Sequence, residues 1–150
     1  MCVTYYTMVI KKMQKNPEEK PEWIKPVFDE IGMTQWGWRV SHRERFELGM
    51  HVEIGSFTMI DARHGVKIED DVKIGFGCVI LSHSSIDNKS GQVILRRRCK
   101  VGANSVIMPG VEVGENAVVG ANSLVNRSIP ASEIWLGSPA KFYKMVERQT

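Results

Sequence analysis

Cysteine is scarce in this chain of 150 residues, and its spacing suggests no pairing. The three cysteines, Cys2, Cys78 and Cys99, are an odd number, form no CxxC motif and accompany eight methionines. This composition argues against a small disulfide-stapled domain and favours a reduced, intracellular setting. We therefore predict a cytoplasmic location.

Long apolar runs and an excess of one charge are also missing. No apolar stretch approaches the roughly 20 residues of a membrane-spanning helix. Residues 1–10 are partly apolar, but lysines follow them instead of preceding them, unlike a secretory leader. Twenty Lys and Arg against 17 Asp and Glu give a formal charge of +3, far from the concentrated positive charge of nucleic-acid-binding domains. We expect one domain with no membrane span and no nucleic-acid partner.

What the sequence does contain is a repeat with a period of six. Neither the helical period of about 3.6 nor the strand period of 2 sustains a strict six, so the repeat predicts a solenoid of short strands and corners. A small or β-branched residue follows four positions after each aliphatic residue of the repeat. The aliphatic positions are Leu95, Val101, Ile107, Val113, Val119 and Val125.

A second period, of eighteen, indicates three hexads in each coil. Gly-Ala-Asn-Ser at 102–105 recurs at 120–123, so the two tetrads should stack on one edge of a triangular prism. Asn104, Asn116 and Asn122 suit left-handed corner conformations, which Asn and Gly adopt at low cost. Each coil covers the aliphatic residues of its neighbours, so the unit is stable only as a stack.

Upstream the repeat is looser and a loop interrupts it. The spacing of six continues through Ile54, Ile60, Ile68, Ile74 and Ile80, with two extra residues before Ile68. Leu95 lies fifteen residues after Ile80, nine more than one hexad. The excess predicts an extruded loop at about residues 82–94, and loops held by a rigid scaffold are frequent sites of function.

The two ends lack the six-residue period. Prolines and a glycine stop over residues 21–32 predict short helical turns, and residues 36–40 predict a lead-in strand. Ser138-Pro139-Ala140 suggests the start of a final helix. We therefore divide the chain into an N-terminal extension (1–50), a β-helix (51–135) and a C-terminal helix (136–150).

With this repeat, the sequence resembles the hexapeptide-repeat acyltransferases, in the branch that contains galactoside and maltose O-acetyltransferases. The likeness covers roughly residues 51–142 and is most specific at 101–111, 119–130 and 136–141. It implies a mainly β fold, a left-handed parallel β-helix, which is an exception to right-handed crossovers. It also implies a homotrimer with active sites between adjacent prisms, acetyl-CoA as co-substrate and no catalytic metal.

The base for acetyl transfer is the first residue that the resemblance suggests. His suits this role near neutral pH, and the family's base follows the strand before the extruded loop, which is the position of His83. The alternative is a loop histidine with a local hydrogen bond. Weaker candidates for acceptor binding, several of them equally explained as turn or corner residues, are Asp61, Arg63, His64, Ser82, Asp87 and Asn88.

The donor site is also assigned by resemblance. Pantetheine would follow a groove past the small residues Ala103 and Ala121, with the Ala103 amide as the oxyanion donor. Asn126, Arg127 and Lys141 match positions that contact CoA phosphates. Arg96, Arg97 and Arg98 replace the family's Gly-Asn-Asn corner, and they are open to binding CoA, a nucleotide-sugar diphosphate or an acidic neighbour across the trimer, or to forming a solvated face.

We therefore predict an acetyl-CoA-dependent O- or N-acetyltransferase acting on a sugar or nucleotide-sugar. One alternative is a γ-type carbonic anhydrase, which needs three histidines on a metal, but the family's second loop histidine is missing after His83. The other is a non-catalytic β-helix scaffold, against which His83, Arg127 and Lys141 together argue.

Overall fold

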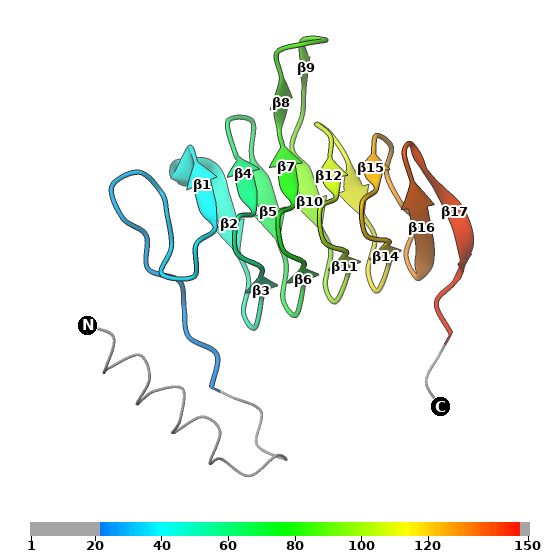
Figure 1. Cartoon of the computed structure of the whole chain (residues 1–150), viewed down its shortest axis with the longest axis horizontal. Helices are drawn as coiled ribbons and strands as arrows, with labels where there is room; N and C mark the ends of the chain where they lie inside the picture. The colour runs from blue at the N-terminus through cyan, green and yellow to red at the C-terminus, as the bar shows by residue number, and fades with distance from the viewer. Residues whose placement is uncertain (1–21, 148–150) are drawn as a thin grey trace.

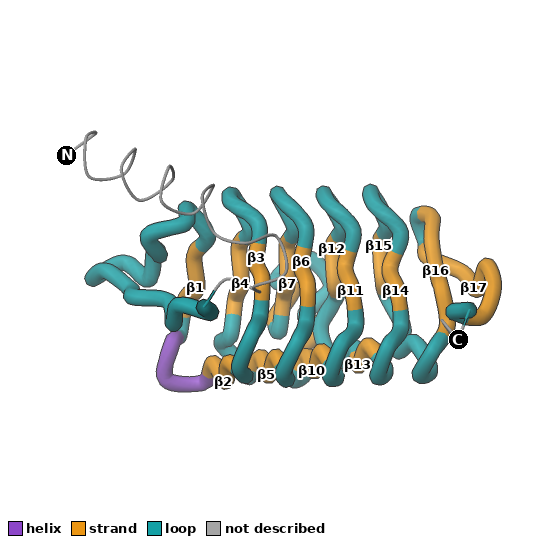
Figure 2. Tube along the Cα trace, turned by 90° about the horizontal axis from the view of Figure 1, so that it is seen from below, coloured by secondary structure: helices purple, strands orange, loops and turns teal. Residues whose placement is uncertain are grey.

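The computed structural model describes residues 22–147 and shows a three-sided solenoid of short parallel strands (Figure 1; Figure 2). The chain passes through a first, a second and a third sheet in turn, then returns to the first sheet one coil further along. The first sheet consists of β1 (Arg39–Ser41), β4 (Met59–Asp61), β7 (Val79–Leu81), β12 (Val106–Ile107) and β15 (Leu124–Val125). The second consists of β2 (Phe46–Leu48), β5 (Val66–Ile68), β10 (Val93–Leu95) and β13 (Glu112–Val113). The third consists of β3 (Glu53–Ile54), β6 (Lys73–Ile74), β11 (Lys100–Val101), β14 (Val118–Val119), β16 (Glu133–Gly137) and β17 (Ala140–Met145).

Three edges run along the solenoid where the chain turns between sheets. The histidine edge follows the first sheet and comprises residues 42–45, 61–65, 82–92, 108–110 and 126–128. The arginine edge follows the second sheet and comprises residues 69–71, 96–98 and 114–116. The glycine edge follows the third sheet and comprises residues 55–58, 75–78, 102–105 and 120–123.

The core consists of aliphatic side chains stacked in register from coil to coil. In the first sheet, Ile60 is level with Ile80, which is level with Ile107. All six aliphatic residues of the predicted repeat, from Leu95 to Val125, are at most 3% exposed. This burial removes apolar surface from water in every coil, and it confirms the predicted left-handed parallel β-helix.

The predicted stacking of the two Gly-Ala-Asn-Ser tetrads is also confirmed. A Cβ atom added to Gly102 would lie 2.4 Å from the amide nitrogen of Ala121, so only glycine allows the two corners to approach this closely. Asn104, Asn116 and Asn122 have φ angles of 57° to 59°, which are the left-handed corner conformations expected.

The solenoid begins earlier than predicted, at Arg39 instead of residue 51. β1 pairs in parallel with β4, and β2 pairs with β5. The eight-residue step from Val40 to Leu48 repeats the step from Ile60 to Ile68, because both coils carry two extra residues on the histidine edge. The extra residues hide the period of six in this first coil.

The helical turns predicted within residues 21–32 are wrong for the described part, residues 22–32, which contains turns and an isolated bridge between Phe28 and Thr34. The Asp29 carboxylate accepts hydrogen bonds from the Ile31 and Met33 amides at 3.0 and 2.8 Å. Such side-chain bonds to the backbone compete with a helix. The one helical turn between residues 22 and 147 is a 3-10 turn, η1 (Arg43–Arg45).

The predicted C-terminal helix is also wrong within residues 136–147. β16 adds to β14 in parallel, and β17 folds back on β16 as an antiparallel strand. Without β16 the backbone groups of β14 would be unpaired on one side, and β16 satisfies them by adding to the sheet as a strand. The predicted loop at 82–94 is correct to Gln92, while Val93 and Ile94 already belong to β10.

No helix in the described range is long and apolar enough to cross a membrane.

Candidate functional site

His83 lies at the base of a two-stranded hairpin that projects from the histidine edge (Figure 1). The hairpin consists of β8 (His83–Ser84) and β9 (Lys89–Ser90), and His83 pairs directly with Ser90 across it. The Nδ1 atom of His83 is 2.9 Å from the Ser90 hydroxyl oxygen. This bond holds the imidazole and occupies Nδ1, so Nε2 is the ring nitrogen left to act on another molecule.

His64 accompanies His83 on the preceding coil of the same edge. The two ring centroids are 5.5 Å apart with an interplanar angle of 37°. The His64 amide donates a hydrogen bond of 2.8 Å to the Ser82 hydroxyl, and Ser82 is fully buried. Ser82, which the sequence suggested as an acceptor contact, therefore fixes the corner that carries His64.

Asp61 is held by its own chain on the same edge. One carboxylate oxygen accepts from the Arg63 amide at 3.0 Å and from the Ser41 hydroxyl at 3.3 Å, and lies 3.3 Å from His42 Nδ1. No role for His42 is predicted from the sequence. The eight-residue step from Val40 to Leu48, equal to the step before His64, is the signal that places it on this edge.

Asp87 and Asn88 form the tip of the hairpin. Hydrogen bonding from the Ser84 hydroxyl and from Lys89, whose ammonium lies 3.0 Å from the carboxylate, lowers the pKa of Asp87. Asn88 has a φ of 53°, which Asn tolerates in turns. These contacts favour the turn interpretation of both residues.

The glycine edge presents backbone amides at its corners. Each corner bonds to the next, since Asn104 N–H donates to Phe76 O and Asn122 N–H donates to Ala103 O, both at 2.8 Å. Within residues 22–147, the Ala103 and Ala121 amides donate to no other residue. Ala103 is half-buried and Ala121 is exposed, so both N–H groups can serve an outside ligand.

The two edges are separate within one chain. β7 starts after Cys78, at the glycine edge, and ends before Ser82, at the histidine edge, where it leads into β8 (Figure 1). His83 therefore lies across the first sheet from Ala103 and Ala121. The structure does not bring the predicted base and the predicted donor groove together in a single chain.

The predicted phosphate contacts divide between these edges. Asn126 and Arg127 are exposed on the histidine edge, after β15. Lys141 pairs with Leu136 across the hairpin of β16 and β17. A Cβ atom added to Gly120 would lie 2.7 Å from the Cβ atom of Leu136. Lys141 is therefore at the C-terminal end of the glycine edge, in line with Ala103 and Ala121.

The arginine edge is an ion-pair network. Arg96 contacts Glu112 at 2.8 Å and Glu69 at 3.0 Å, and Arg98 contacts Glu115 at 2.6 Å. Hydrogen bonds to Glu112 and Glu69 raise the pKa of Arg96. Burial raises the pKa of Glu69, but the Arg97 amide and the Arg96 guanidinium outweigh it, so the net pKa of Glu69 is lowered.

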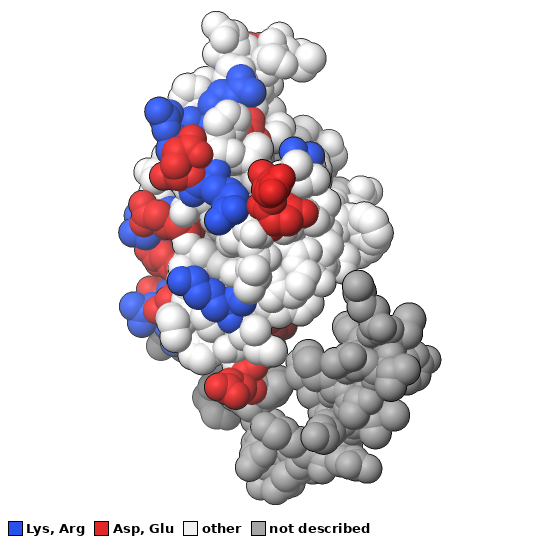
Figure 3. All heavy atoms as spheres, turned by 90° about the vertical axis from the view of Figure 1, so that its left-hand side faces the viewer, with Lys and Arg blue, Asp and Glu red and all other residues white. Residues whose placement is uncertain are grey.

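The acids that pair with Arg96 and Arg98 therefore lie in their own chain, instead of across the trimer as one of the alternatives expected. Figure 3, which faces the left-hand side of Figure 1, shows basic and acidic side chains interleaved on that side of the molecule.

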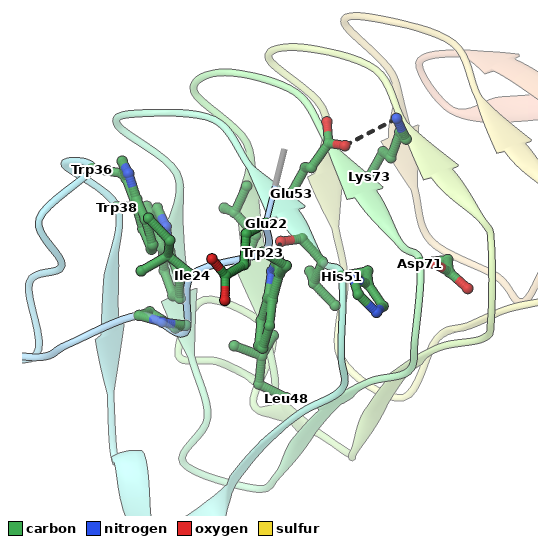
Figure 4. A pocket seen from close by; sticks show the side chains of 13 residues that line it. Glu22, Trp23, Ile24, Trp36, Trp38, Leu48, His51, Glu53, Asp71 and Lys73 are labelled. Carbon is green, nitrogen blue, oxygen red and sulfur yellow. Dashed lines mark hydrogen bonds and ion pairs between the residues drawn. The ribbon is translucent and has the colours of Figure 1, made fainter. Parts of the chain in front are cut away.

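A pocket of about 720 Å³ opens elsewhere, against the third sheet near the N-terminal end (Figure 4). Trp23, Trp36 and Trp38 contribute to its wall, and Lys73 pairs with Glu53 at 3.0 Å at its margin. The Trp23 indole donates to the Val52 carbonyl at 3.0 Å. No predicted site residue lines this pocket. In the described chain, no group of three or more His, Cys, Asp or Glu side chains is placed to hold a metal ion.

A left-handed parallel β-helix of hexapeptide coils, with a histidine at the base of an extruded loop, defines the class of this protein. The family model for the bacterial transferase hexapeptide (six repeats) matches residues 93–127. These residues therefore carry the hexapeptide repeat of this transferase family.

Known proteins agree with this assignment. The chain is 30% identical over 115 residues to YvoF of Bacillus subtilis (strain 168), whose name describes it provisionally as an acetyltransferase. The match covers 74% of this chain and 66% of YvoF. Across the first curated relatives, the chain spans 33% to 66% of their length.

Two solved structures share the fold. The hexapeptide-repeat-containing acetyltransferase VCA0836 of Vibrio cholerae, complexed with acetyl coenzyme A, has a TM-score of 0.68 at 23% identity, over 74% of this chain and 66% of that one. A variant of AntD, an N-acyltransferase from Bacillus cereus, was solved with dTDP-4-amino-4,6-dideoxyglucose and coenzyme A. It has a TM-score of 0.62 at 21% identity, over 77% and 80% of the two chains. At these identities the matches establish the fold.

Proposed function

We propose that this protein is an acetyltransferase that moves an acetyl group from acetyl-CoA directly to a hydroxyl or amine of a sugar or nucleotide-linked sugar. The relative YvoF and the acetyl-CoA complex of VCA0836 support the donor. AntD, with its bound dTDP-sugar, supports the acceptor class. The free, buried thiols of Cys78 and Cys99 agree with the cytoplasmic location that belongs to the same proposal.

In this mechanism His83 is the general base. Nε2 takes the proton from the acceptor hydroxyl or amine, whose oxygen or nitrogen bonds to the thioester carbon. The carbonyl oxygen becomes an oxyanion that accepts a hydrogen bond from the Ala103 amide. The C–S bond then breaks, and the CoA thiolate takes the proton from the imidazolium. The observation that carries the proposal is the Ser90 contact of 2.9 Å at Nδ1, because it leaves Nε2 as the base.

The separation of the two edges gives the proposal a second requirement. Since His83 and Ala103 border opposite sides of the first sheet, the histidine edge of one prism must face the glycine edge of another. A closed ring in which every chain uses both edges is a heterologous assembly, and we propose a homotrimer. In this trimer CoA is held by Ala103, Ala121 and Lys141 of one chain. Its phosphates are approached by Arg127 and Asn126 of the next chain.

The test is His83→Ala, assayed by thiol release from acetyl-CoA over a panel of sugars and nucleotide-sugars. We expect kcat to fall by at least about 100-fold with little change in the Kd of acetyl-CoA, since loss of a general base affects the transition state. Ser90→Ala should lower kcat less, because it frees the ring without removing it.

His51→Ala is the matched control, because His51 is an exposed histidine outside the histidine edge. Equal turnover in wild type and His83→Ala removes His83 from the mechanism. A wild-type protein that binds acetyl-CoA but acylates nothing in the panel contradicts the acceptor class instead.

A further inference from the structure

Two phenylalanines interrupt an otherwise small-residue glycine edge. In successive corners the residue after glycine is Ser56, Phe76, Ala103 and Ala121, and the next residue is Phe57, Gly77, Asn104 and Asn122. Phe57 is 71% exposed and Phe76 is 52% exposed. Their rings contact each other edge to face, with centroids 5.4 Å apart at 74°.

Neither phenylalanine is explained by the folding of its corner. Phe57 has a φ of 63°, at a position where the other three corners have Asn or Gly. A bulky residue in this left-handed region is strained, at a cost in folding free energy, and such strain is typical of functional positions. The ring recovers little of this cost by burial, because most of its surface is exposed.

Phe76 lies directly beside Ala103 along the edge. A Cβ added to Gly75 would be 2.5 Å from the Ala103 amide nitrogen, and Asn104 N–H donates to the Phe76 carbonyl at 2.8 Å. Adjacent coils are about 4.8 Å apart, as are paired strands. The side chains that project from the edge are therefore small at Ala103 and Ala121, whereas the aromatic ring of Phe76 projects one coil before Ala103.

We propose that Phe76, supported by Phe57, limits the length of the acyl group that the protein accepts. This inference rests on the proposed function, in which the thioester oxygen lies on the Ala103 amide and CoA extends past Ala121 toward Lys141. The acyl group then points the other way, toward Phe76. An acetyl group ends before the ring, whereas the two additional carbons of a butyryl group, about 2.5 Å of chain, extend into it.

The selectivity is steric and is therefore visible in binding alone, without an acceptor. Forcing extra methylenes against a packed group is unfavourable, because side chains or backbone must shift to make room. We expect butyryl-CoA to bind the wild type at least about tenfold more weakly than acetyl-CoA. Phe76→Ala removes the ring that blocks the longer acyl chain. It should strengthen the binding of butyryl-CoA and leave that of acetyl-CoA unchanged, so that the two Kd values come within about threefold of each other. Phe57→Ala should have a smaller effect in the same direction, because it lets the Phe76 ring move.

The experiment is titration calorimetry of acetyl-CoA and butyryl-CoA with wild type, Phe76→Ala and Phe57→Ala, with sedimentation to record the assembly of each. Phe142→Ala is the matched control. Phe142 is 53% exposed and lies on β17, which three strands separate from β6, the strand before Phe76. As the neighbour of Lys141 in the strand, its side chain points to the opposite face. The ratio of the butyryl-CoA Kd to the acetyl-CoA Kd should be the same for Phe142→Ala as for the wild type.

Three results overturn the inference. Equal binding of both ligands to the wild type shows that no limit exists. A Phe76→Ala variant that weakens both ligands equally, or that dissociates the assembly, shows that the ring serves a general groove or a subunit contact. Failure of the wild type to bind acetyl-CoA overturns the proposed function as well, so the two failures are distinguishable.

Discussion

Gly75→Ala should destabilise the protein, because the added methyl group forces the coil of Gly75 away from the stacked coil of Ala103. The added Cβ would lie 2.5 Å from the Ala103 amide nitrogen and 2.8 Å from its Cα. Both are backbone atoms of the stacked coil, so no side-chain rotation relieves the clash. Overpacking of this kind costs up to about 3 kcal/mol. Alanine also restricts the unfolded chain, which returns about 0.4–1 kcal/mol, and the net loss is about 2 kcal/mol.

For a chain of 150 residues, this loss corresponds to a decrease in Tm of about 4–8 °C. Circular dichroism melts should be recorded at one protein concentration, because assembly makes Tm depend on it. Gly110→Asn is the control: a Cβ at Gly110 meets nothing within 4 Å, and Asn tolerates its φ of 78°. A Gly75→Ala variant that melts within about 1 °C of wild type would refute the close stacking of the two corners.

Three further variants or treatments test other parts of the molecule. Arg127→Ala should raise the KM for acetyl-CoA several-fold with kcat unchanged, as lost phosphate binding requires, and an unchanged KM in steady-state assays contradicts its role. Because the pKa of Glu69 is lowered from its ordinary 4.5, its ionic contribution is present above pH 4.5 and is lost as pH falls through the lowered value. The difference in Tm between wild type and Arg96→Ala should therefore shrink in melts below pH 4.5, and a constant difference would assign the effect to lost packing. Burial raises the pKa of Cys78, and raises that of Cys99 to about 12. Both thiols should therefore stay unmodified by iodoacetamide at pH 8 until urea is added, as measured by peptide mapping. Rapid labelling of either thiol in the native protein would show that the coils open.

The sequence predicts the regular part of the fold because each hexad is locally complete. An aliphatic side chain, a small residue and a corner residue are all read from six consecutive positions, and every coil repeats the same solution. The corner conformations could also be predicted from the sequence, since Asn104 and Asn122 adopt the left-handed conformation that their residue type favours.

The irregular parts depend on neighbours that are distant in sequence. β16 and β17 form strands because β14 offers an open edge, and local propensity at Ser138-Pro139-Ala140 contains no trace of that edge. His42 was missed for a related reason. Two extra residues on one corner shift the period, and only comparison with the coil of His64 shows that the shift is a repeated feature.

The placement of the candidate site follows from the width of one sheet. β7 is three residues long, and at about 3.3 Å per residue it separates its two edges by about 10 Å. Reacting groups must approach within about 3.5 Å, so no side-chain rotation brings the His83 imidazole to a thioester held on the Ala103 amide of the same chain. The proposed function therefore needs the two predicted residues to come from different copies of the chain, as the family resemblance implies. The two edges differ in a way that suits the proposed assembly: the histidine edge carries extra residues and projects, while the glycine edge has only small residues at Gly102, Ala103, Gly120 and Ala121, where it receives the neighbouring prism.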